Sequence, residues 1–441
     1  MTTRRLVVVL YSRRAGVIER NGGSLAFTYD AEYLADARAT PLSLSMPLST
    51  TRYTNKWVEA YLRGLLPDNG EVRRRWAAHF GLRDRDTFGL VGAIGGDAAG
   101  GAVFLPDDAY PDALAEGHVE GIDEHAIAER LRRLRLDDAD WLGDDEHWSL
   151  AGAQGKFTLR ELDGGWGIAH GSEPSTHIVK PGSGRIPGHA LLENVSMTAA
   201  RVLGLDVAGT SYVEFEDQPA VVVARYDRRL RDGRWRRVHQ EDFCQTFALD
   251  PSRKYEADQG PGVRRIADRL RTGTQDDSVE RFAKAIIVNY LLGAPDAHAK
   301  NYSLLLVGRL ARLAPLYDIA SGLTEDRGGR LRFGKAAMSI GGECAFGEVR
   351  GKHWERFAVA VGVPADLVRD WVTELAAAVP DAVSDATAAV PGRAPDRDVL
   401  PVLTARVARL AQLTVAGLND LSSGRRVGPS GSEVLVAEPE V

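Results

Sequence analysis

The chain changes character near residue 240, and this change limits the folds open to it. From residue 149 to residue 240, short β-rich runs alternate with glycine turns and one helical stretch, ALLENVSMTAARVLGL. Beyond residue 240, apolar residues recur at the spacing of amphipathic helices, with two loop-rich interruptions, APDAHAKNYSLLLV and LAPLYDIASGL. This order predicts an α+β protein with a small β-rich lobe and a larger, mainly helical lobe.

A further small α+β unit precedes these two lobes. The runs RLVVVLYS and SLAFTYD flank Asn21, Gly22 and Gly23, a combination typical of a β-hairpin. Two helical segments follow, and residues 87–104 return to a glycine-rich, strand-like sequence. The predicted organisation is an N-terminal subdomain (1–105), an acidic connector with one helix (106–148), an N-lobe (149–240), a helical C-lobe (241–420) and a mobile tail (421–441).

Composition excludes several classes of protein. With 44% hydrophobic and 26% charged residues over 441 positions, the chain is neither fibrous nor wholly disordered. A formal net charge of -6 gives no overall basic field for nucleic acid or anionic membranes. Cys244 and Cys344, the two cysteines, are too few for a disulfide framework or a cysteine zinc site. No apolar run approaches the ~20 residues of a membrane span, and the N-terminus lacks a signal-peptide core, so we expect a cytoplasmic protein with no membrane partner.

The most informative polar motif lies at residues 296–301, DAHAKN, directly after an apolar helix. Asp296 and Asn301 have the D-x-x-x-x-N offset of a kinase catalytic loop, in which the Asp accepts the proton of the attacking hydroxyl and the Asn binds Mg²⁺. Asp318, in the run LYDIA, is placed to bridge the metal to the ATP phosphates. Polar residues after a helix also serve as caps and turns, but the three together favour phosphoryl transfer.

Lys180 ends the strand-like run HIVK and resembles the lysine that kinases present to the α- and β-phosphates of ATP. The helix that follows carries Glu193, its natural ion-pair partner. The chain holds only eight lysines among 55 basic residues, and a lysine retained in so arginine-rich a sequence is informative where a compact ammonium is required.

The sequence SLAGAQGKFT, residues 149–158, is the candidate phosphate-binding loop. Gly152 and Gly155 allow backbone N–H groups to approach phosphate oxygens, and Lys156 adds positive charge. A Walker A loop is excluded because Leu150 stands where that motif needs glycine and because a strand, not a helix, follows. Residues 241–243 fall where strands give way to helices, the position of a kinase hinge.

Together these segments resemble the HipA-type serine/threonine-kinase toxins of type II toxin–antitoxin modules. The resemblance is carried by SLAGAQGK, HIVKP, the ENVSM helix, ARYDR, QEDFCQ with KYE downstream, PDAHAKN and LYDIAS. It extends in order over residues 5–420 and includes the N-terminal subdomain. It implies a two-lobed protein-kinase-like (phosphoinositide-kinase-like) fold of the α+β class, with a small N-terminal α+β subdomain and a mainly helical C-terminal lobe.

The resemblance also implies a set of site residues. Asp296 and Lys180 would be catalytic, Asn301 and Asp318 would hold Mg²⁺, Glu193 would form the supporting ion pair, and Ser149 would be the autophosphorylated residue whose modification inactivates the enzyme. The residues implied to bind ATP are Ala151, Gly152, Ala153, Gln154, Gly155, Lys156, Lys180, Glu241, Asp242, Phe243, His298 and Tyr317.

Partners follow from the same resemblance. A small helix-turn-helix antitoxin of the HipB type would bind the chain and connect it to operator DNA, and the protein substrate would be glutamyl-tRNA synthetase or another translation factor. The sequence departs from the family at Gly155, at Phe157 and in an Ala/Pro-rich segment, 379–396, that we expect to be a loop.

Two alternatives stay open at this point. An aminoglycoside-type small-molecule kinase uses a similar set of acidic residues and would place phosphate on a small molecule. A non-catalytic, antitoxin-bound transcriptional corepressor would use the fold as a scaffold, with the basic stretch 225–237 near DNA phosphates.

Overall fold

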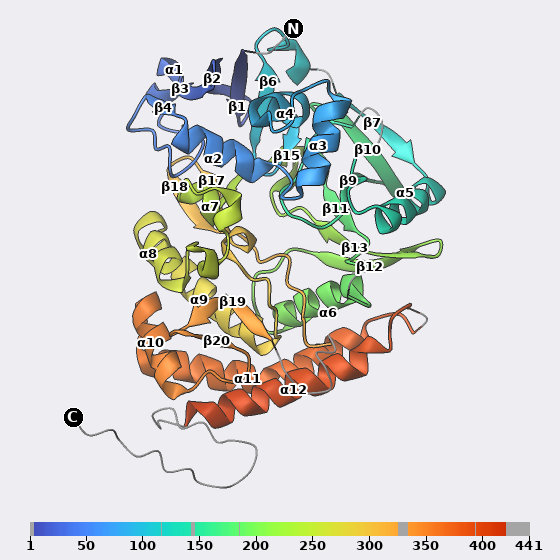
Figure 1. The fold of residues 1–441 in the computed structure, drawn as a ribbon, viewed down its shortest axis with the longest axis vertical. Helices are drawn as coiled ribbons and strands as arrows, with labels where there is room; N and C mark the ends of the chain where they lie inside the picture. The colour runs from blue at the N-terminus through green and yellow to red at the C-terminus, as the bar shows by residue number, and fades with distance from the viewer. Residues whose placement is uncertain are drawn as a thin grey trace, which may run out of the picture.

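The computed structural model describes residues 4–115, 117–142, 146–184, 186–324, 334–392 and 394–419. Figure 1 shows the N-terminal subdomain at the top, beside the N-lobe sheet, with the helical C-lobe below. The mobile tail predicted for residues 421–441 lies outside the described residues.

The N-terminal subdomain is built on a five-stranded sheet of order β4-β3-β2-β1-β6. The predicted hairpin at residues 21–23 is confirmed, because Asn21 pairs with Ser24 where β2 turns into β3. The elements are β1 (Arg5–Leu10), β2 (Arg13–Asn21), β3 (Ser24–Tyr29), α1 (Ala31–Ala35), β4 (Arg52–Thr54), α2 (Lys56–Leu65), α3 (Gly70–His79), α4 (Thr87–Ile94), β5 (Asp97–Ala98) and β6 (Ala102–Pro106).

The strand-like interpretation of residues 87–104 is wrong for its first half, which forms the helix α4. Asp86 caps this helix by accepting a hydrogen bond from the Gly89 backbone N–H. The helix is apolar on nearly all sides, so it lacks the periodicity that marks a surface helix. Gly92 permits close packing, since a Cβ there would lie 3.0 Å from Leu6.

The N-lobe contains a six-stranded sheet of order β12-β13-β11-β9-β10-β7. The segment 106–148, expected to be a connector, contributes β7 and α5 to this lobe, and β7 pairs along β10. The elements are η1 (Asp112–Leu114), β7 (Gly117–Ile122), α5 (Glu124–Leu136), β8 (Trp148–Ser149), β9 (Phe157–Leu162), β10 (Gly165–Gly171), β11 (His177–Lys180), α6 (His189–Val202), β12 (Thr210–Phe215) and β13 (Gln218–Ala224).

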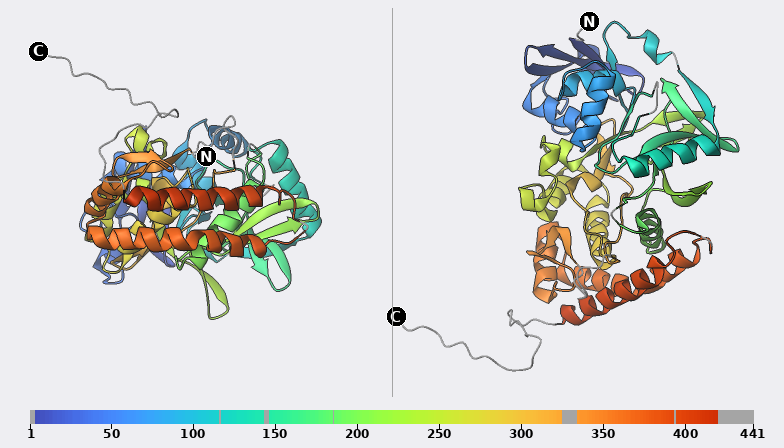
Figure 2. Two further views of the ribbon diagram at one scale, coloured as in Figure 1. Left: turned by 90° about the horizontal axis from the view of Figure 1, so that it is seen from below. Right: turned by 45° about the vertical axis from the view of Figure 1, so that its right-hand side comes forward.

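The hairpin β14–β15 leads into the C-lobe, whose last helices, α11 and α12, lie side by side along the base of the molecule (Figure 2). The elements are β14 (Arg228–Arg231), β15 (Arg234–Arg237), β16 (His239–Asp242), α7 (Phe243–Thr246), η2 (Pro251–Arg253), η3 (Glu256–Asp258), α8 (Val263–Gly273), α9 (Ser278–Leu291), η4 (Ala299–Asn301), β17 (Ser303–Val307), β18 (Leu310–Leu313), β19 (Lys335–Ile340), β20 (Glu343–Ala345), α10 (Gly351–Val361), α11 (Ala365–Ala388) and α12 (Val399–Leu418).

The loop predicted for residues 379–396 is wrong for its first ten positions, because α11 continues through Pro380 to Ala388. Proline removes one backbone hydrogen bond from a helix interior. Here Val379 and Val383 are fully buried on either side of it, and the packing of α11 on α6 and α12 outweighs that loss.

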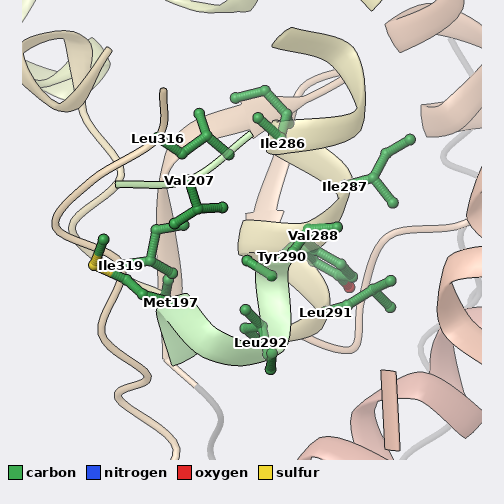
Figure 3. Packing of buried hydrophobic residues seen from close by; sticks show 14 of the residues in the cluster. Met197, Val207, Ile286, Ile287, Val288, Tyr290, Leu291, Leu292, Leu316 and Ile319 are labelled. Carbon is green, nitrogen blue, oxygen red and sulfur yellow. The ribbon is translucent and has the colours of Figure 1, made fainter. Parts of the chain in front are cut away.

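Two large hydrophobic clusters hold the molecule together. One fills the C-lobe around α9, where Ile287, Leu291 and Leu292 pack with residues of α6 and the following loops (Figure 3). The other runs from the N-terminal subdomain into the N-lobe without a break, joining residues such as Leu6 and Trp76 to Phe157. The N-terminal subdomain and the N-lobe therefore share a core.

Within the part of the chain that the structure describes, one helix, α12, is long and apolar enough to cross a membrane by length and composition alone. Its buried residues, Leu403, Val407 and Leu410 among them, belong to the C-lobe core. The helix α12 contacts α9, α10 and α11, so packing within the C-lobe core explains its apolar face.

Candidate functional site

A cleft of about 1020 Å³ opens where the N-terminal subdomain, the N-lobe and the C-lobe meet. Most of the residues that the sequence singled out line it, although they come from segments up to 167 positions apart, such as Ala151 and Asp318. Those on its wall are Ala151, Gly152, Ala153, Gln154, Lys156, Lys180, Glu193, Asp242, Asp296, His298, Asn301, Tyr317 and Asp318.

The end of α9 aims the candidate catalytic loop at the cleft. Gly293 adopts a left-handed conformation with φ 63°, and its N–H donates to the Tyr290 carbonyl while the Ala294 N–H donates to the Asn289 carbonyl. This pair of bonds is a Schellman motif, which ends a helix sharply. The chain then enters the loop that begins at Asp296.

Asp296 is held from two sides. The Tyr255 hydroxyl donates to its Oδ1 at 2.6 Å, and the Asn301 Nδ2 donates to its backbone carbonyl at 2.9 Å. Its side chain is 61% exposed to the cleft, so the other carboxylate oxygen is accessible to an incoming hydroxyl. This is the geometry that a general base requires.

His298 stands beside this base in its neutral form. Burial lowers the pKa of His298 to about 4, although Asp296 favours the charged state. Its ring lies edge-on to Tyr255, with centroids 4.9 Å apart. Within the described ranges its Nδ1 is buried and finds no hydrogen-bond partner.

Lys180 lies between two carboxylates. Its ion pair with Glu193 was predicted from the sequence, and the structure adds a second ion pair with Asp318. Its Nζ is 2.7 Å from Glu193 Oε1 and 2.5 Å from Asp318 Oδ1. Burial alone would lower the pKa of Lys180, but the two acids outweigh burial and raise it. Likewise, burial opposes ionisation of Asp318, but Lys180 and Lys156 hold the pKa of its carboxyl well below the usual range.

Asp318 adopts an unusual backbone conformation, with φ 59°, which non-glycine residues rarely accept outside functional or turn positions. The preceding residue fixes it: the Tyr317 hydroxyl donates to the Lys300 carbonyl at 2.6 Å and accepts from Ser303 Oγ at 2.7 Å. Tyr317 therefore ties the segment that carries Asp318 to the candidate catalytic loop.

Asn301 and Asp318 have donor atoms that suit Mg²⁺. The Nδ2 of Asn301 is used within the loop, which leaves its Oδ1 as the acceptor, and Asp318 supplies a charged carboxylate that is 40% exposed. Mg²⁺ prefers such hard oxygens and often takes only one or two from protein, completing its shell with phosphates and water. Among the described residues no cluster of three or more His, Cys, Asp or Glu side chains forms a metal site, so a protein-only cage is not what these residues build.

The glycine loop is closed by Lys156, whose Nζ donates to the Ala151 carbonyl at 2.8 Å. Gly152 has φ 109°, a backbone conformation that other residues rarely adopt, which favours glycine at this position. Burial, reinforced by the charge of Lys180, lowers the pKa of Lys156 to about 8. Gly155 is off the cleft wall, because its N–H donates to Asp138 Oδ1 at 2.7 Å.

Ser149 precedes the loop and is buried, with 1% of its surface exposed. Its Oγ donates to the Leu65 carbonyl of the N-terminal subdomain at 2.6 Å. The hydroxyl is therefore not presented to the cleft in this conformation.

The hinge position predicted from the sequence is not supported by the placement of its side chains. Glu241 points into the N-terminal subdomain, where it accepts from the Leu44 N–H at 2.8 Å, and burial raises its pKa to about 7. Phe243 belongs to the C-lobe core. Of the three, only Asp242 reaches the cleft, where it caps α7. The residues that follow the last N-lobe strand, 224–226, line the cleft instead.

Sequence reasoning missed Asp68, Lys254, Tyr255 and Lys300, all of which line the cleft. Lys254 and Tyr255 belong to the run KYE, which carries part of the family resemblance but was given no role in the site, and Asp68 comes from the N-terminal subdomain. A signal was present in the lysines, because four of the chain's eight line this cleft: Lys156, Lys180, Lys254 and Lys300.

The basic stretch 225–237 divides into a buried and an exposed part. Arg225, Arg228 and Arg237 pair with Asp97 and Asp227 in an internal network that joins the N-lobe to the N-terminal subdomain, so they do not reach a partner. The exposed part is the face of the β14–β15 hairpin formed by Arg229, Arg231, Arg234 and Arg236.

Comparisons with known proteins agree with this geometry. Residues 6–106 match the model of the HipA N-terminal domain, and residues 148–383 match that of the HipA-like C-terminal domain. The chain is 33% identical over 391 residues to Y4mE of Sinorhizobium fredii, which carries the provisional name of a kinase, covering 87% of this chain and 92% of that protein. It is 28% identical over 409 residues to the serine/threonine-protein kinase toxin HipA of Shewanella oneidensis, covering 88% and 91%.

A solved structure shows the same fold. The complex of Shewanella oneidensis HipA, HipB and operator DNA contains a chain that superposes with a TM-score of 0.82 at 25% identity, over 94% of this chain and 99% of that one. The two-lobed, protein-kinase-like α+β fold predicted from the sequence is confirmed.

Proposed function

Because the chain belongs to the HipA family of kinases, we propose that it transfers the γ-phosphoryl group of Mg-ATP to a serine or threonine of a protein, with Asp296 as the general base. One observation carries the assignment: Asp296 is exposed to the cleft yet fixed by Tyr255 and Asn301. A carboxylate so placed can orient a hydroxyl and accept its proton as the phosphoryl group transfers.

The other cleft residues have complementary roles in this proposal. Lys180, steadied by Glu193, contacts ATP phosphates, and Lys156 with the amides of residues 151–154 holds them from the N-lobe side. Asn301 and Asp318 hold Mg²⁺, which when bound neutralises charge on the phosphates. His298, with its buried and unpartnered Nδ1, contacts the nucleotide, and Tyr317 positions Asp318.

We place the adenine against the backbone of residues 224–226 rather than residues 241–243. The support is positional, since residues 224–226 leave the last strand of the N-lobe sheet and line the cleft, whereas Glu241 and Phe243 are directed into the protein. Adenine recognition by hinge backbone leaves the side chains there free to vary.

We further propose that Ser149 is an autophosphorylation site. Its hydroxyl is buried against Leu65, so the loop must leave the cleft before a kinase can reach it. A phosphate, with about 1.5–2 negative charges, cannot return to that buried position beside the Leu65 carbonyl. Modification would therefore keep the glycine loop out of the ATP site and switch the enzyme off.

In the cell we propose a growth-inhibiting toxin, held by a HipB-like antitoxin and through it by operator DNA. The support is the similarity to a chain solved in such a complex. The proposed substrate is a translation-related protein such as glutamyl-tRNA synthetase. An aminoglycoside-type activity has less support, because the N-terminal subdomain and the kinase lobes both match the HipA models.

A corepressor role can coexist with catalysis, and one observation favours it. On the β14–β15 hairpin, Arg229 lies opposite Arg236 and Arg231 lies opposite Arg234. Like charges directly across a strand pair repel each other, and a row of phosphates would relieve that repulsion.

The proposal is tested by incubating the protein and its Asp296→Asn variant with Mg²⁺ and labelled ATP, then mapping phosphate by mass spectrometry. We expect label on Ser149 in the parent and at least a thousand-fold less in the variant. Asp107→Asn is the matched control, because Asp107 forms an exposed ion pair with Arg5 far from the cleft wall. Equal labelling of parent and Asp296→Asn would refute the assignment of the base.

A further inference from the structure

The loop that joins α2 to α3 in the N-terminal subdomain reaches into the cleft. Pro67 forms a parallel bridge with Gly152 of the glycine loop, and the Asp68 N–H donates to the Gly152 carbonyl at 2.8 Å. Arg73 of α3 holds this loop from behind by donating to the carbonyls of Pro67 and Asp68. The loop is thus fixed to its own subdomain and to the phosphate-binding segment.

The Asp68 side chain makes a second connection, to the C-lobe. Its Oδ1 lies 2.6 Å from Lys300 Nζ and its Oδ2 lies 2.9 Å from Lys254 Nζ. All three side chains are largely buried, with exposed fractions of 14% for Asp68, 3% for Lys300 and 15% for Lys254. Burial opposes ionisation, but the two lysines outweigh it and lower the pKa of Asp68 to about 2.

The two lysines lie in the segments that hold the base. Lys300 is inside the catalytic loop, immediately before Asn301. Lys254 immediately precedes Tyr255, whose hydroxyl donates to Asp296. One carboxylate from the N-terminal subdomain therefore fixes both segments that orient Asp296, and its backbone fixes the glycine loop at the same time.

We propose that Asp68 is a positioning residue of the phosphotransfer site, supplied by the N-terminal subdomain, which sets the catalytic loop relative to the phosphate-binding loop. The inference rests on the proposed kinase chemistry of the cleft. It means that the kinase lobes are catalytically incomplete without the N-terminal subdomain, whose Asp68 carboxylate acts on the reacting atoms through Lys254 and Lys300.

The role makes an unusual prediction about nucleotide binding. Asp68→Asn removes a negative charge from the cleft wall and releases two ammonium groups that also line the cleft. The polyphosphate of the nucleotide is then attracted at least as strongly as before, while the catalytic loop loses its anchor. Catalysis and nucleotide affinity should separate, whereas general damage to the fold weakens both together.

The test measures ADP formation at saturating Mg-ATP, the Kd for ADP by calorimetry, and the Tm, for the full chain and for Asp68→Asn. We expect ADP formation to be slowed at least ten-fold, with the Kd unchanged or tighter. Asp107→Asn, the same change at an exposed ion pair of the same subdomain, should match the parent in all three measurements.

Two results would overturn the inference: an unchanged rate in Asp68→Asn, or a Kd weakened in proportion to the rate. If Asp68→Asn does not fold, Lys254→Met removes one arm of the clamp and leaves the Lys300 pair, and we expect it to slow ADP formation several-fold at unchanged Kd; no slowing would overturn the inference. A parent protein that forms no ADP would refute the proposed function itself, which distinguishes the two failures.

Discussion

Replacing Lys156 with methionine should stabilise the protein while it weakens ATP binding. In the folded state burial lowers the pKa of Lys156 from 10.5 to about 8. Keeping this ammonium charged at pH 7 therefore costs about 3 kcal/mol of folding free energy. The methionine variant avoids that cost and keeps an unbranched, polarisable side chain beside Trp141, over which the ammonium now lies at 5.2 Å.

Two lost interactions reduce the gain. The hydrogen bond from Lys156 to the Ala151 carbonyl is worth about 1 kcal/mol, and the cation–π contact with Trp141 about 0.5–1 kcal/mol more. The net expectation at pH 7 is that Lys156→Met raises the free energy of unfolding by about 1–2 kcal/mol. Nucleotide affinity should fall at least ten-fold, because a charge aimed at the phosphates is lost.

The sign of the pH dependence separates this explanation from improved packing. Since the unfolded chain binds the Lys156 proton more tightly than the folded one, the cost is full below pH 8 and disappears as pH rises toward 10.5. The stability advantage of Lys156→Met should therefore shrink over that window. Urea titrations at pH 7 and pH 10, with Lys335→Met at an exposed position as control, measure it.

A variant less stable than the parent at pH 7, with a difference that does not change by pH 10, would refute the reasoning. In that case Lys156 would be a structural residue whose bond to the Ala151 carbonyl is worth more than its desolvation. Unchanged ATP affinity would separately remove it from the phosphate site.

Three other predictions follow from the site. Tyr255→Phe removes only the hydroxyl that holds Asp296, so phosphotransfer should slow about ten-fold at unchanged ADP affinity; a normal rate would count against this role. Glu193→Gln removes one of the two carboxylates that pair with Lys180, so that only Asp318 still pairs with it. We expect ADP formation to slow about ten-fold or more, and equal rates would contradict the need for the Lys180–Glu193 pair. Changing the four exposed arginines of the β14–β15 hairpin to glutamine should weaken binding of the antitoxin complex to operator DNA and reduce its salt dependence in gel-shift assays, while phosphotransfer is unaffected; an unchanged shift would exclude the hairpin as a DNA contact.

The parts of the site that the sequence predicted are those where chemistry fixes both residue type and spacing. Asp296 and Asn301 belong to one loop, so their offset alone reports their proximity. Lys180 and Glu193 lie on an adjacent strand and helix, and they meet as expected. Predicting Asp318 required only that a carboxylate follow shortly after the candidate catalytic loop.

The hinge that we propose differs from the one predicted from the sequence, for the opposite reason. In the proposed arrangement adenine is recognised by backbone, which leaves no side-chain signature, so the change from strand to helix near Glu241 does not by itself locate the hinge. The chain makes an extra hairpin, β14–β15, between the last N-lobe strand and β16. That excursion moves the lobe boundary from residue 240 back to about 225.

Long-range contacts that belong to no motif could not be predicted. Asp68 meets Lys300 across 232 positions of sequence, and nothing in the run LPDN indicates a cleft residue. The helix α4 and the extension of α11 through Pro380 were missed because burial, not local pattern, decides them. In both cases tertiary packing outweighs the low helix propensity of the glycine or proline residues in the segment.

Three energetically unfavourable features lie on the wall of the cleft. Asp318 holds a left-handed backbone conformation, Lys156 is charged at neutral pH despite burial, and His298 keeps a buried nitrogen without a partner among the described residues. Each is a cost that packing elsewhere must offset. A Mg-nucleotide would offset the electrostatic part of this cost, since it would bring phosphate charge to Lys156 and metal charge to the Asp318 carboxylate. The strain is therefore what a site selected for its ligand, rather than for the stability of the empty protein, should contain.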